Sequence, residues 1–292
     1  MVVGSLNADL TVRTERLPRP GETVHGSPLV VAPGGKSANQ AAAASRLGGR
    51  VVMVGAVGED DHGDLLLREL RQAGVEVEGV RRLPGVATGT AMITVDERGE
   101  NTIVISAGAN GELTPDQLPE LPQDAAILCL CFEIPMDTVV AAAELARERR
   151  VRVLLNPSPT APIPDRLLAA VDVLLLNESE AADLLAAGPD WDATAARLRE
   201  RRVPAAIVTL GAAGAVVLEA GRATAIPAIP ITPVDTTGAG DAFTGAVAAR
   251  LADGASLVEA AHFGARAAAW SATRPGAQPS YATLAELENW AT

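Results

Sequence analysis

Residues 234–243 (VDTTGAGDAF) combine an acid with a glycine-rich turn in a way that suits chemistry on an anion. They lead directly into an alanine-rich helical pattern, Ala242–Leu251. Gly238 and Gly240 let the backbone turn tightly, so that N–H groups converge on the start of this helix. The first amides of a helix have no internal partner, and the helix dipole favours negative charge there. The turn is therefore a candidate anion site.

The acid in this turn, Asp241, has two interpretations. A carboxylate among N–H donors repels a bound anion, so it is an odd choice for anion binding alone. It makes sense as a general base that takes the proton from a hydroxyl attacking a bound phosphate. The alternative is that Asp241 caps the helix or complements its dipole, as acids often do. The stretch by itself leaves both interpretations open.

A second glycine turn, Gly34 and Gly35, is followed by Lys36 and a helical pattern. The Gly-Lys-Ser order resembles the end of a P-loop, but that motif requires a glycine where the chain has Val30, so we reject it. We expect the glycines instead to let a ligand approach the backbone within reach of Lys36 and Asn39. All of the 24 basic residues except Lys36 are arginine. A compact ammonium that can follow a moving phosphate is one reason for this lysine, and chance retention is the alternative.

The elements that must position these turns alternate along most of the chain. Continuous apolar strands alternating with helices predict an α/β fold with a mostly parallel central sheet covered by helices on both faces. The expected strands are 1–6, 51–57, 125–131, 151–155, 173–176 and 205–210. The expected helices are one from the second glycine turn to about residue 47, then 64–73, 137–148, 178–187, 194–201 and 242–251, followed by a second alanine-rich helical stretch. Ligands of such sheets bind beyond the carboxyl ends of the strands. The polar residues at these ends are Asn7, Asp9, Glu133, Asn156, Asn177 and Thr209.

Two other segments, 10–31 and 88–106, do not follow this alternation. The first is interrupted by prolines and glycines, and the second reads as a hairpin with a polar turn at 96–101. Together they predict a small separate β-sheet. Because the hairpin is apolar on both faces, something must cover it. The candidates are the substrate, the main body of the protein or a second subunit.

The composition limits the class of function. A length of 292 residues suits one large α/β domain, or a large domain with a small appendage. The formal net charge of −12 argues against nucleic acid or an anionic membrane as partner. No apolar run approaches the roughly 18 residues of a membrane helix, and no basic leader opens the sequence. These features predict a soluble, cytoplasmic protein.

The cysteines and histidines give little sign of a metal or a disulfide. Cys129 and Cys131 lie two apart in a strand pattern, which is a poor disulfide geometry and predicts buried free thiols in a reducing compartment. His25, His62 and His262 show no metal-ligand spacing. We therefore do not expect a histidine-bound metal.

With these residues together, the chain resembles the ribokinases of the PfkB carbohydrate-kinase family over essentially its whole length. Six segments in order carry the resemblance: 4–9 (GSLNAD), 34–40 (GGKSANQ), 107–110 (AGAN), 177–180 (NESE), 235–241 (DTTGAGD) and 276–280 (GAQPS). The resemblance implies a single ribokinase-like α/β domain over residues 1–292, with 10–31 and 88–106 forming a β-sheet lid. It also implies that ATP phosphorylates the 5-hydroxyl of D-ribose, with magnesium and activation by potassium.

The resemblance assigns roles by position. Asp241 would be the general base, and the amides of Gly238, Ala239 and Gly240 would form the anion hole. The residues that would hold the sugar are Asn7, Asp9, Gly35, Lys36, Asn39, Glu133 and Asp241. The residues that would serve the nucleotide are Asn177, Glu180, Thr209, Gly211 and Gly240, with Glu180 also binding magnesium through water. The residues at the matching potassium positions are Asp235, Thr237, Ser271, Arg274, Gly276 and Ser280.

The residues themselves also give a reason for the monovalent cation. Asp235 lies on the strand side of the glycine turn, and the segment 274–280 has two prolines and a glycine, so it presents free backbone carbonyls. Carbonyls with one carboxylate are hard oxygen ligands, and a single negative charge suits a large monovalent ion. The alternative is that Asp235 only makes an Asx-type cap of the turn.

Two positions depart from the family pattern. Ribokinases usually have glycine at the position of Ser37, where a side chain could narrow the sugar pocket or add a hydrogen bond. Ala265 stands where relatives can carry a histidine near the adenine, which leaves base selectivity open. The alternative substrates are deoxyribose, another small sugar such as fructose, or a nucleoside, although few aromatic side chains are present to stack a base.

Two further expectations concern activity and assembly. The alternative from a different class of function is a non-catalytic sugar-binding or regulatory module on the same fold. It is disfavoured because it would have no need for Asp241, Gly238, Gly240 and Lys36 together. We also expect a homodimer in which two lids pair, because this would cover the apolar hairpin and its strand edges.

Overall fold

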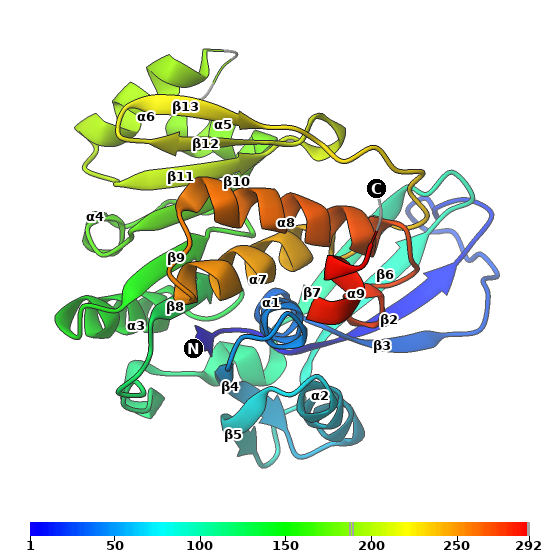
Figure 1. Ribbon diagram of the computed structural model, residues 1–292. Helices are drawn as coiled ribbons and strands as arrows, with labels where there is room; N and C mark the ends of the chain where they lie inside the picture. The colour runs from blue at the N-terminus through cyan, green and yellow to red at the C-terminus, as the bar shows by residue number, and fades with distance from the viewer. Residues whose placement is uncertain (187, 189, 291–292) are drawn as a thin grey trace.

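The computed structural model describes residues 1–186, 188 and 190–290, which form two β-sheets with helices (Figure 1). Within these residues the larger sheet has nine strands, in the order β13-β12-β11-β10-β9-β8-β1-β4-β5. Their bounds are β1 Val2–Val3, β4 Val52–Gly58, β5 Glu76–Leu83, β8 Ile127–Cys131, β9 Arg152–Asn156, β10 Val173–Asn177, β11 Ala205–Thr209, β12 Ala215–Glu219 and β13 Arg222–Ile226. Neighbouring strands are parallel except in the pairs that involve β12. The predicted mostly parallel α/β fold is confirmed.

Helices cover both faces of the large sheet, because successive strand residues point to opposite sides. In β9, Leu154 packs into one core while Val153 and Leu155 pack into the other. The first core is covered by α1 (Lys36–Arg46), α2 (Asp61–Gln72), α7 (Ala239–Ala252) and α8 (Leu257–Ala272). The second is covered by α3 (Met136–Glu148), α4 (Asp165–Leu168), α5 (Glu178–Leu185) and α6 (Trp191–Glu200). Among the helices described, none is long and apolar enough to cross a membrane.

The smaller sheet has the order β3-β2-β6-β7, with β2 Asn7–Arg13, β3 Val30–Gly34, β6 Gly89–Val95 and β7 Asn101–Ser106. Its central pair, β2 and β6, is parallel, and both outer pairs are antiparallel. Its strands β2 and β3 extend beyond the expected first segment, 10–31, because β2 begins at Asn7 and β3 ends at Gly34. Asn7 and Asp9 therefore belong to the small sheet, whereas the sequence suggested the end of a strand over residues 1–6. β1 itself ends at Val3.

Some elements were not predicted from the pattern. β5 is an edge strand with exposed charged residues, and β12 and β13 form a hairpin that turns at Ala220 and Gly221 with positive φ at both. The short helix α4 and the C-terminal helix α9 (Leu284–Glu288) were also missed. The expected helix 178–187 ends at Leu185, and residue 187 lies outside the described part of the chain.

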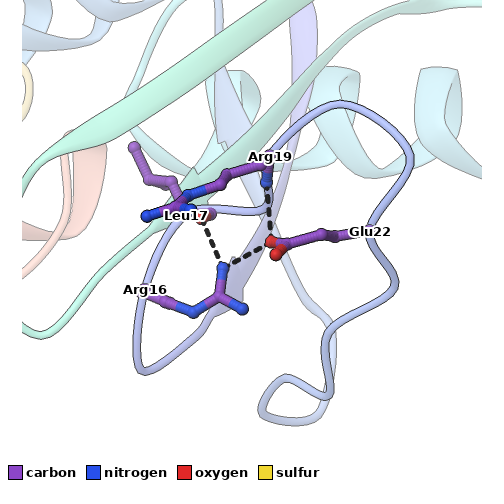
Figure 2. A network of polar contacts seen from close by, with 4 residues as sticks. All are labelled: Arg16, Leu17, Arg19 and Glu22. Atoms are coloured by element: carbon purple, nitrogen blue, oxygen red, sulfur yellow. Dashed lines mark hydrogen bonds and ion pairs between the residues drawn. The ribbon is translucent and has the colours of Figure 1, made fainter.

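The loop between β2 and β3 is exposed but has internal contacts. Figure 2 shows the Glu22 carboxylate accepting from the Arg19 amide at 3.0 Å and paired with the Arg16 guanidinium. An isolated bridge between Thr14 and Gly26 closes the loop further back. The exposed ion pair stabilises little by itself, so the loop is shaped mainly by its backbone contacts.

The apolar character of the small sheet is visible at its surface. Among the described residues, the exposed large hydrophobic side chains are Leu29, Val30, Val31, Met92, Ile103, Val104, Ile105 and Val234. All of them except Val234 lie in or next to β3, β6 and β7. Successive strand residues Ile103 and Val104 point to opposite faces and are 52% and 60% exposed, so both faces carry apolar surface, as the hairpin pattern predicts.

Candidate active site

Asp241 lies in the first turn of α7, and its carboxylate is held by side chains from α1. Asn39 Nδ2 donates to one carboxylate oxygen at 3.0 Å, and Gln40 Nε2 donates to the other at 3.2 Å. Burial raises the pKa of Asp241, while the Lys36 ammonium and these two amides oppose the shift. Asp241 makes no capping bond; the N-cap residue of α7 is Gly238. A carboxylate fixed in this way by two donors keeps lone pairs that can accept a proton from a ligand.

Lys36 begins α1, and its backbone connects the glycine turn with Glu133 at the end of β8. The Lys36 amide donates to Glu133 Oε2 at 3.1 Å, and the Ser5 hydroxyl donates to the same oxygen. Burial disfavours the charged Lys36 side chain, but the carboxylates of Asp241 and Glu133 outweigh this and raise its pKa. Lys36 therefore stays a cation beside the acids. Such a group can stabilise a phosphate that carries more than one negative charge.

Asp9 reaches the same place from the small sheet. Burial, followed by the charges of Glu133 and Asp241, raises the pKa of Asp9 to about 7. A Cβ at Gly34 would stand 2.2 Å from an Asp9 carboxylate oxygen, so only glycine fits at that position. At Gly35 a Cβ would stand 2.6 Å from the Asn7 amide, and the φ of 88° also favours glycine. The two glycines thus bring the backbone against the strand that carries Asn7 and Asp9.

The glycine turn before α7 has the expected form. Gly238 adopts a left-handed conformation with φ 74°, and Tyr281 donates its hydroxyl to the Gly238 carbonyl at 3.2 Å. The Ala239 amide donates to the Thr236 carbonyl at 3.1 Å, so it is already engaged within the turn. Among the described residues, the amides of Gly238 and Gly240 have no partner. A Cβ at Gly240 would meet no protein atom within 4 Å, which places this residue at open space.

A cavity of about 520 Å³ opens beside this turn. Thr209, Gly211, Ala239 and Gly240 line it, as do residues of the extended segment 228–233. The side of α8 that faces it is formed by Ala265, Ala268, Ala269 and Ala272. The size and largely apolar lining suit a planar heterocycle, and Gly240 in the lining has a free amide that can bind an anion.

Asn177 and Glu180 form the N-terminal cap of α5. Asn177 Oδ1 accepts from the Glu180 amide at 2.8 Å, and Glu180 Oε2 accepts from the Asn177 amide at 2.9 Å. Glu180 is buried, and its charge contributes to raising the pKa of Lys36, so it lies near the site. Neither residue lines the cavity. Both side chains therefore have a structural partner in this reciprocal cap, which the sequence did not predict.

The two loops expected to hold a monovalent cation are joined directly. Asp235 accepts from the Thr237 amide and from the Gly276 amide, both at 2.9 Å. Burial alone would raise the pKa of Asp235, but these hydrogen bonds lower it. Among the described residues, the carbonyls of Asp235, Thr237 and Gly276 accept no hydrogen bond, so their oxygens are available to a cation. The Asx turn considered from the sequence is present, and it also bridges to the second loop.

The remaining expected cation residues, Ser271, Arg274 and Ser280, make contacts of their own. The Ser271 and Ser280 hydroxyls are buried 2.6 Å from one another, and the Ser271 carbonyl accepts from the Arg274 amide at 3.0 Å. The Arg274 guanidinium stacks on Trp270, 3.4 Å from the ring centre. Its charge is thereby held against the helix by a cation–π contact.

Several residues at the site carried no assigned role in the sequence. Gln40, Asn110, Gln278 and Tyr281 were unassigned, although the first three lie in segments that resemble the family. Gln278 donates to Asn39 Oδ1 at 3.0 Å, and Asn110 donates to Asn7 Oδ1 at 2.8 Å. These contacts join residues more than 100 positions apart, so no local spacing could have shown them.

The Ser37 side chain, which departs from the family pattern, has a partner on β8. It is fully buried, and its hydroxyl lies 2.9 Å from the Cys131 sulfur. A Cβ at Gly4 would stand 2.0 Å from this hydroxyl, so the Ser37 side chain occupies space that Gly4 leaves free. The Ser37 side chain is therefore enclosed between Gly4 and Cys131. Cys129 and Cys131 are both buried free thiols, as predicted.

Comparison with known proteins agrees with this arrangement. Residues 1–284 match the model of the pfkB family carbohydrate kinases. The chain is 38% identical to a ribokinase of Schizosaccharomyces pombe, covering 99% of this chain and 96% of that one. It is 32% identical to a deoxyribokinase of Salmonella typhi, covering 99% and 97%. The structure of Arabidopsis thaliana ribokinase with ribose and ATP is similar, with a TM-score of 0.88, 33% identity and coverage of 99% and 98%. The chain thus belongs to the pfkB family of carbohydrate kinases.

Proposed function

We propose that this protein transfers the terminal phosphate of ATP to the 5-hydroxyl of D-ribose. The observation that carries the proposal is the arrangement of Asp241, which is held by Asn39 and Gln40 beside the free Gly240 amide. Lys36 adds a positive charge close to this acid. Full-length similarity to ribokinases, including one seen with ribose and ATP, supports ribose as the acceptor.

The reaction needs a base, a bound phosphate and a fixed geometry. Asp241 takes the proton of the sugar hydroxyl while the hydroxyl oxygen forms a bond to the terminal phosphorus of ATP. The bond from that phosphorus to the bridging oxygen breaks, and ADP leaves with the electron pair. The Gly238 and Gly240 amides and the Lys36 ammonium stabilise the negative charge on the transferred group. Since burial raises the pKa of Asp241, the carboxylate is a stronger base than an exposed aspartate.

The sugar site is formed where the two sheets meet. Asn7 and Asp9 from β2, the Gly35 backbone, Asn39 and Glu133 supply both donors and acceptors for hydroxyl groups. The Glu133 carboxylate is fixed by the Lys36 amide and Ser5, so it offers its other oxygen in a set direction. The cavity lined by Thr209, Gly211 and the α8 alanines would hold the nucleotide base.

Magnesium fits the site only together with the nucleotide. Among the described residues there is no group of three or more histidine, cysteine or acidic side chains that could hold a metal. Glu180 supplies one buried carboxylate whose Oε1 remains free. This matches the way magnesium usually binds, through phosphates, water and one or two carboxylates. Bound in this way, the ion would neutralise charge on the ATP phosphates.

Potassium activation is the second part of the proposal. The free carbonyls of Asp235, Thr237 and Gly276, near Ser271, Arg274 and Ser280, form a set of hard oxygen ligands with one carboxylate. The Asp235 side chain joins this loop to the turn that carries Gly238 and Gly240. A cation here would fix that turn without touching the sugar, and small displacements of such donors are costly.

A homodimer through the lid is the third part. The edge strands β3 and β7 each pair with a strand on one side only within the described residues, and apolar residues such as Ile103 and Val104 are exposed on both faces. A second copy of the same sheet would cover these faces and edges together.

Coupled ATP turnover tests the function directly. The panel is D-ribose, 2-deoxyribose, fructose and a nucleoside, each assayed with magnesium and with or without potassium. We expect the highest kcat/KM for ribose. A deoxyribokinase is among the relatives, so a preference for 2-deoxyribose would replace ribose as the proposed substrate but keep the proposed reaction. Tight sugar binding with no turnover on any acceptor would favour the non-catalytic module instead.

A further inference from the structure

The passage from the large sheet to the small sheet is bound by one buried side chain, that of Asn110. Asn110 lies in a short 3-10 helix, Gly108–Glu112, directly after β7, and is 1% exposed. Its Oδ1 accepts from the Leu6 amide at 2.9 Å, and its Nδ2 donates to the Leu6 carbonyl at 3.0 Å. The same Nδ2 donates to Asn7 Oδ1 at 2.8 Å. Asn110 thus contacts both the backbone at the start of β2 and a side chain of the proposed sugar site.

These contacts fix which way both amides point. The Leu6 amide can only donate and the Leu6 carbonyl can only accept, so the Asn110 oxygen and nitrogen are distinguished by backbone partners. The Asn110 nitrogen must then meet an acceptor on Asn7, which makes the contacting atom of Asn7 its oxygen. The Asn7 NH2 is left over and donates to no described group. It is also not among the enclosed polar atoms that lack a partner, which are Thr14 Oγ1, Gln40 Oε1 and Arg46 Nε.

We propose that Asn110 is a positioning residue that holds the Asn7 amide with its NH2 toward the sugar. Asn7 then acts as a hydrogen-bond donor and selects a sugar hydroxyl oxygen as acceptor, beside the acids Asp9 and Glu133. A freely rotating Asn7 would present oxygen or nitrogen equally and would lose this preference. The inference rests on the proposed sugar site but assigns a role to a residue that does not itself touch the sugar.

The surrounding backbone encloses Asn110. The Asn110 amide donates to the Ala107 carbonyl at 3.0 Å, and the Ala109 amide donates to the Ala87 carbonyl at 2.9 Å. A Cβ at Gly89, the first residue of β6, would stand 2.2 Å from Asn110 Nδ2 and 2.4 Å from Asn7 Oδ1. The Asn7–Asn110 pair therefore lies against β6, and it joins β2 to the 3-10 helix that follows β7.

The test compares sugar binding with sugar turnover. Asn110→Ala removes the donor to Asn7, and Asn110→Asp keeps the shape and the bond from the Leu6 amide but cannot donate. For both variants we expect the ribose Kd and KM to rise about 10- to 100-fold, the range for a lost buried hydrogen bond and a misdirected amide. The KM for ATP should change less than threefold, and the change in kcat should be smaller than the change in the KM for ribose.

A double-mutant cycle separates positioning from general structure. Asn7→Ala, Asn110→Ala and the double variant are compared by calorimetric ribose binding without ATP. If Asn110 acts through Asn7, the double variant binds ribose as weakly as Asn7→Ala alone. If Asn110→Ala weakens binding by the same factor in both backgrounds, the proposal is overturned. Should Asn110→Ala not fold, the cycle is run with Asn110→Asp.

Thr138→Val is the matched control. Thr138 is fully buried and donates to the Leu113 carbonyl at 2.6 Å, directly after the 3-10 helix that carries Asn110. This variant loses one buried hydrogen bond in the same neighbourhood, so it should lower the melting temperature with ribose binding unchanged. If it weakens ribose binding as much as the Asn110 variants, the effect is structural and the proposal fails. Wild-type turnover on the sugar panel tests the proposed function separately, because the cycle measures binding alone.

Discussion

Replacement of Asp241 by asparagine tests the central chemical assignment. The substitution keeps the shape of the side chain but removes its ability to accept a proton. Loss of a positioned general base typically lowers the rate roughly 10²- to 10⁴-fold. Because Asp241 is held by two amide donors, we expect kcat to fall within this range while ribose and ATP still bind.

The same contacts set the expected change in stability. Asparagine places an NH2 group opposite either Asn39 Nδ2 or Gln40 Nε2, and one such unmade hydrogen bond costs about 1–3 kcal/mol. The substitution also removes the negative charge, and with it the free-energy cost of burying that charge, which is the cause of the raised pKa of Asp241. This second effect stabilises the variant. The two effects offset one another, so the free energy of unfolding should change little compared with the fall in kcat.

The assay measures kcat at saturating ribose and ATP, with dissociation constants from calorimetry. Asp172→Asn is the matched control, because Asp172 accepts from the Val153 amide at 2.8 Å just before β10, at the amino end of a central strand and not at the carboxyl ends where the site lies. It should keep wild-type kcat. An Asp241→Asn variant with kcat within about threefold of wild type would refute the assignment of Asp241 as base, since this is well below the range for a lost base.

Four further predictions follow from individual contacts. The pKa of Asp9 is raised to about 7, so between about pH 4 and 7 the folded protein holds a proton that the unfolded chain releases. The free energy of unfolding should therefore fall as the pH rises from about 4 to 7. Urea unfolding of Asp9→Asn should lack this pH dependence, and the inflection of the ribose KM expected near pH 7 in the wild type should be absent in the variant. An unchanged pH dependence of stability in Asp9→Asn would contradict the prediction. Ala268→Leu should narrow the cavity and raise the ATP KM roughly tenfold with the ribose KM unchanged, measured by steady-state kinetics. Potassium should raise kcat more than sodium does in wild type but not in Asp235→Ala, and equal rates in potassium-free buffer would exclude the cation site. Ile103→Asp should convert a dimer to a monomer in light scattering, and a wild-type monomer at micromolar concentration would rule out pairing of the lids.

Local patterns in the sequence were sufficient to predict much of the fold. The alternation of apolar strands and helices predicted a mostly parallel sheet, because periodicity of 2 and 3.6 residues reports burial directly. The turns at Gly34–Gly35 and Gly238–Gly240 were predicted because glycine lets the backbone turn tightly, and the structure confirms positive φ at Gly35 and Gly238. Polar residues at the carboxyl ends of strands likewise indicated where a site would lie. All of these are properties of short segments.

Only the tertiary structure decided how these segments meet. The edge strands β5 and β13 could not be predicted, because charged or polar residues interrupt the apolar residues along them. β12 does have a continuous apolar run, Ala215–Leu218, but its place beside β11 depends on the tertiary pairing. Asn39 and Gln40 reach Asp241 across about 200 residues of sequence, and Asn110 reaches Asn7 across 103. The sequence showed each of these residues but not its partner. A side chain's partner depends on the packing of two cores and on the junction of two sheets, which no local spacing encodes.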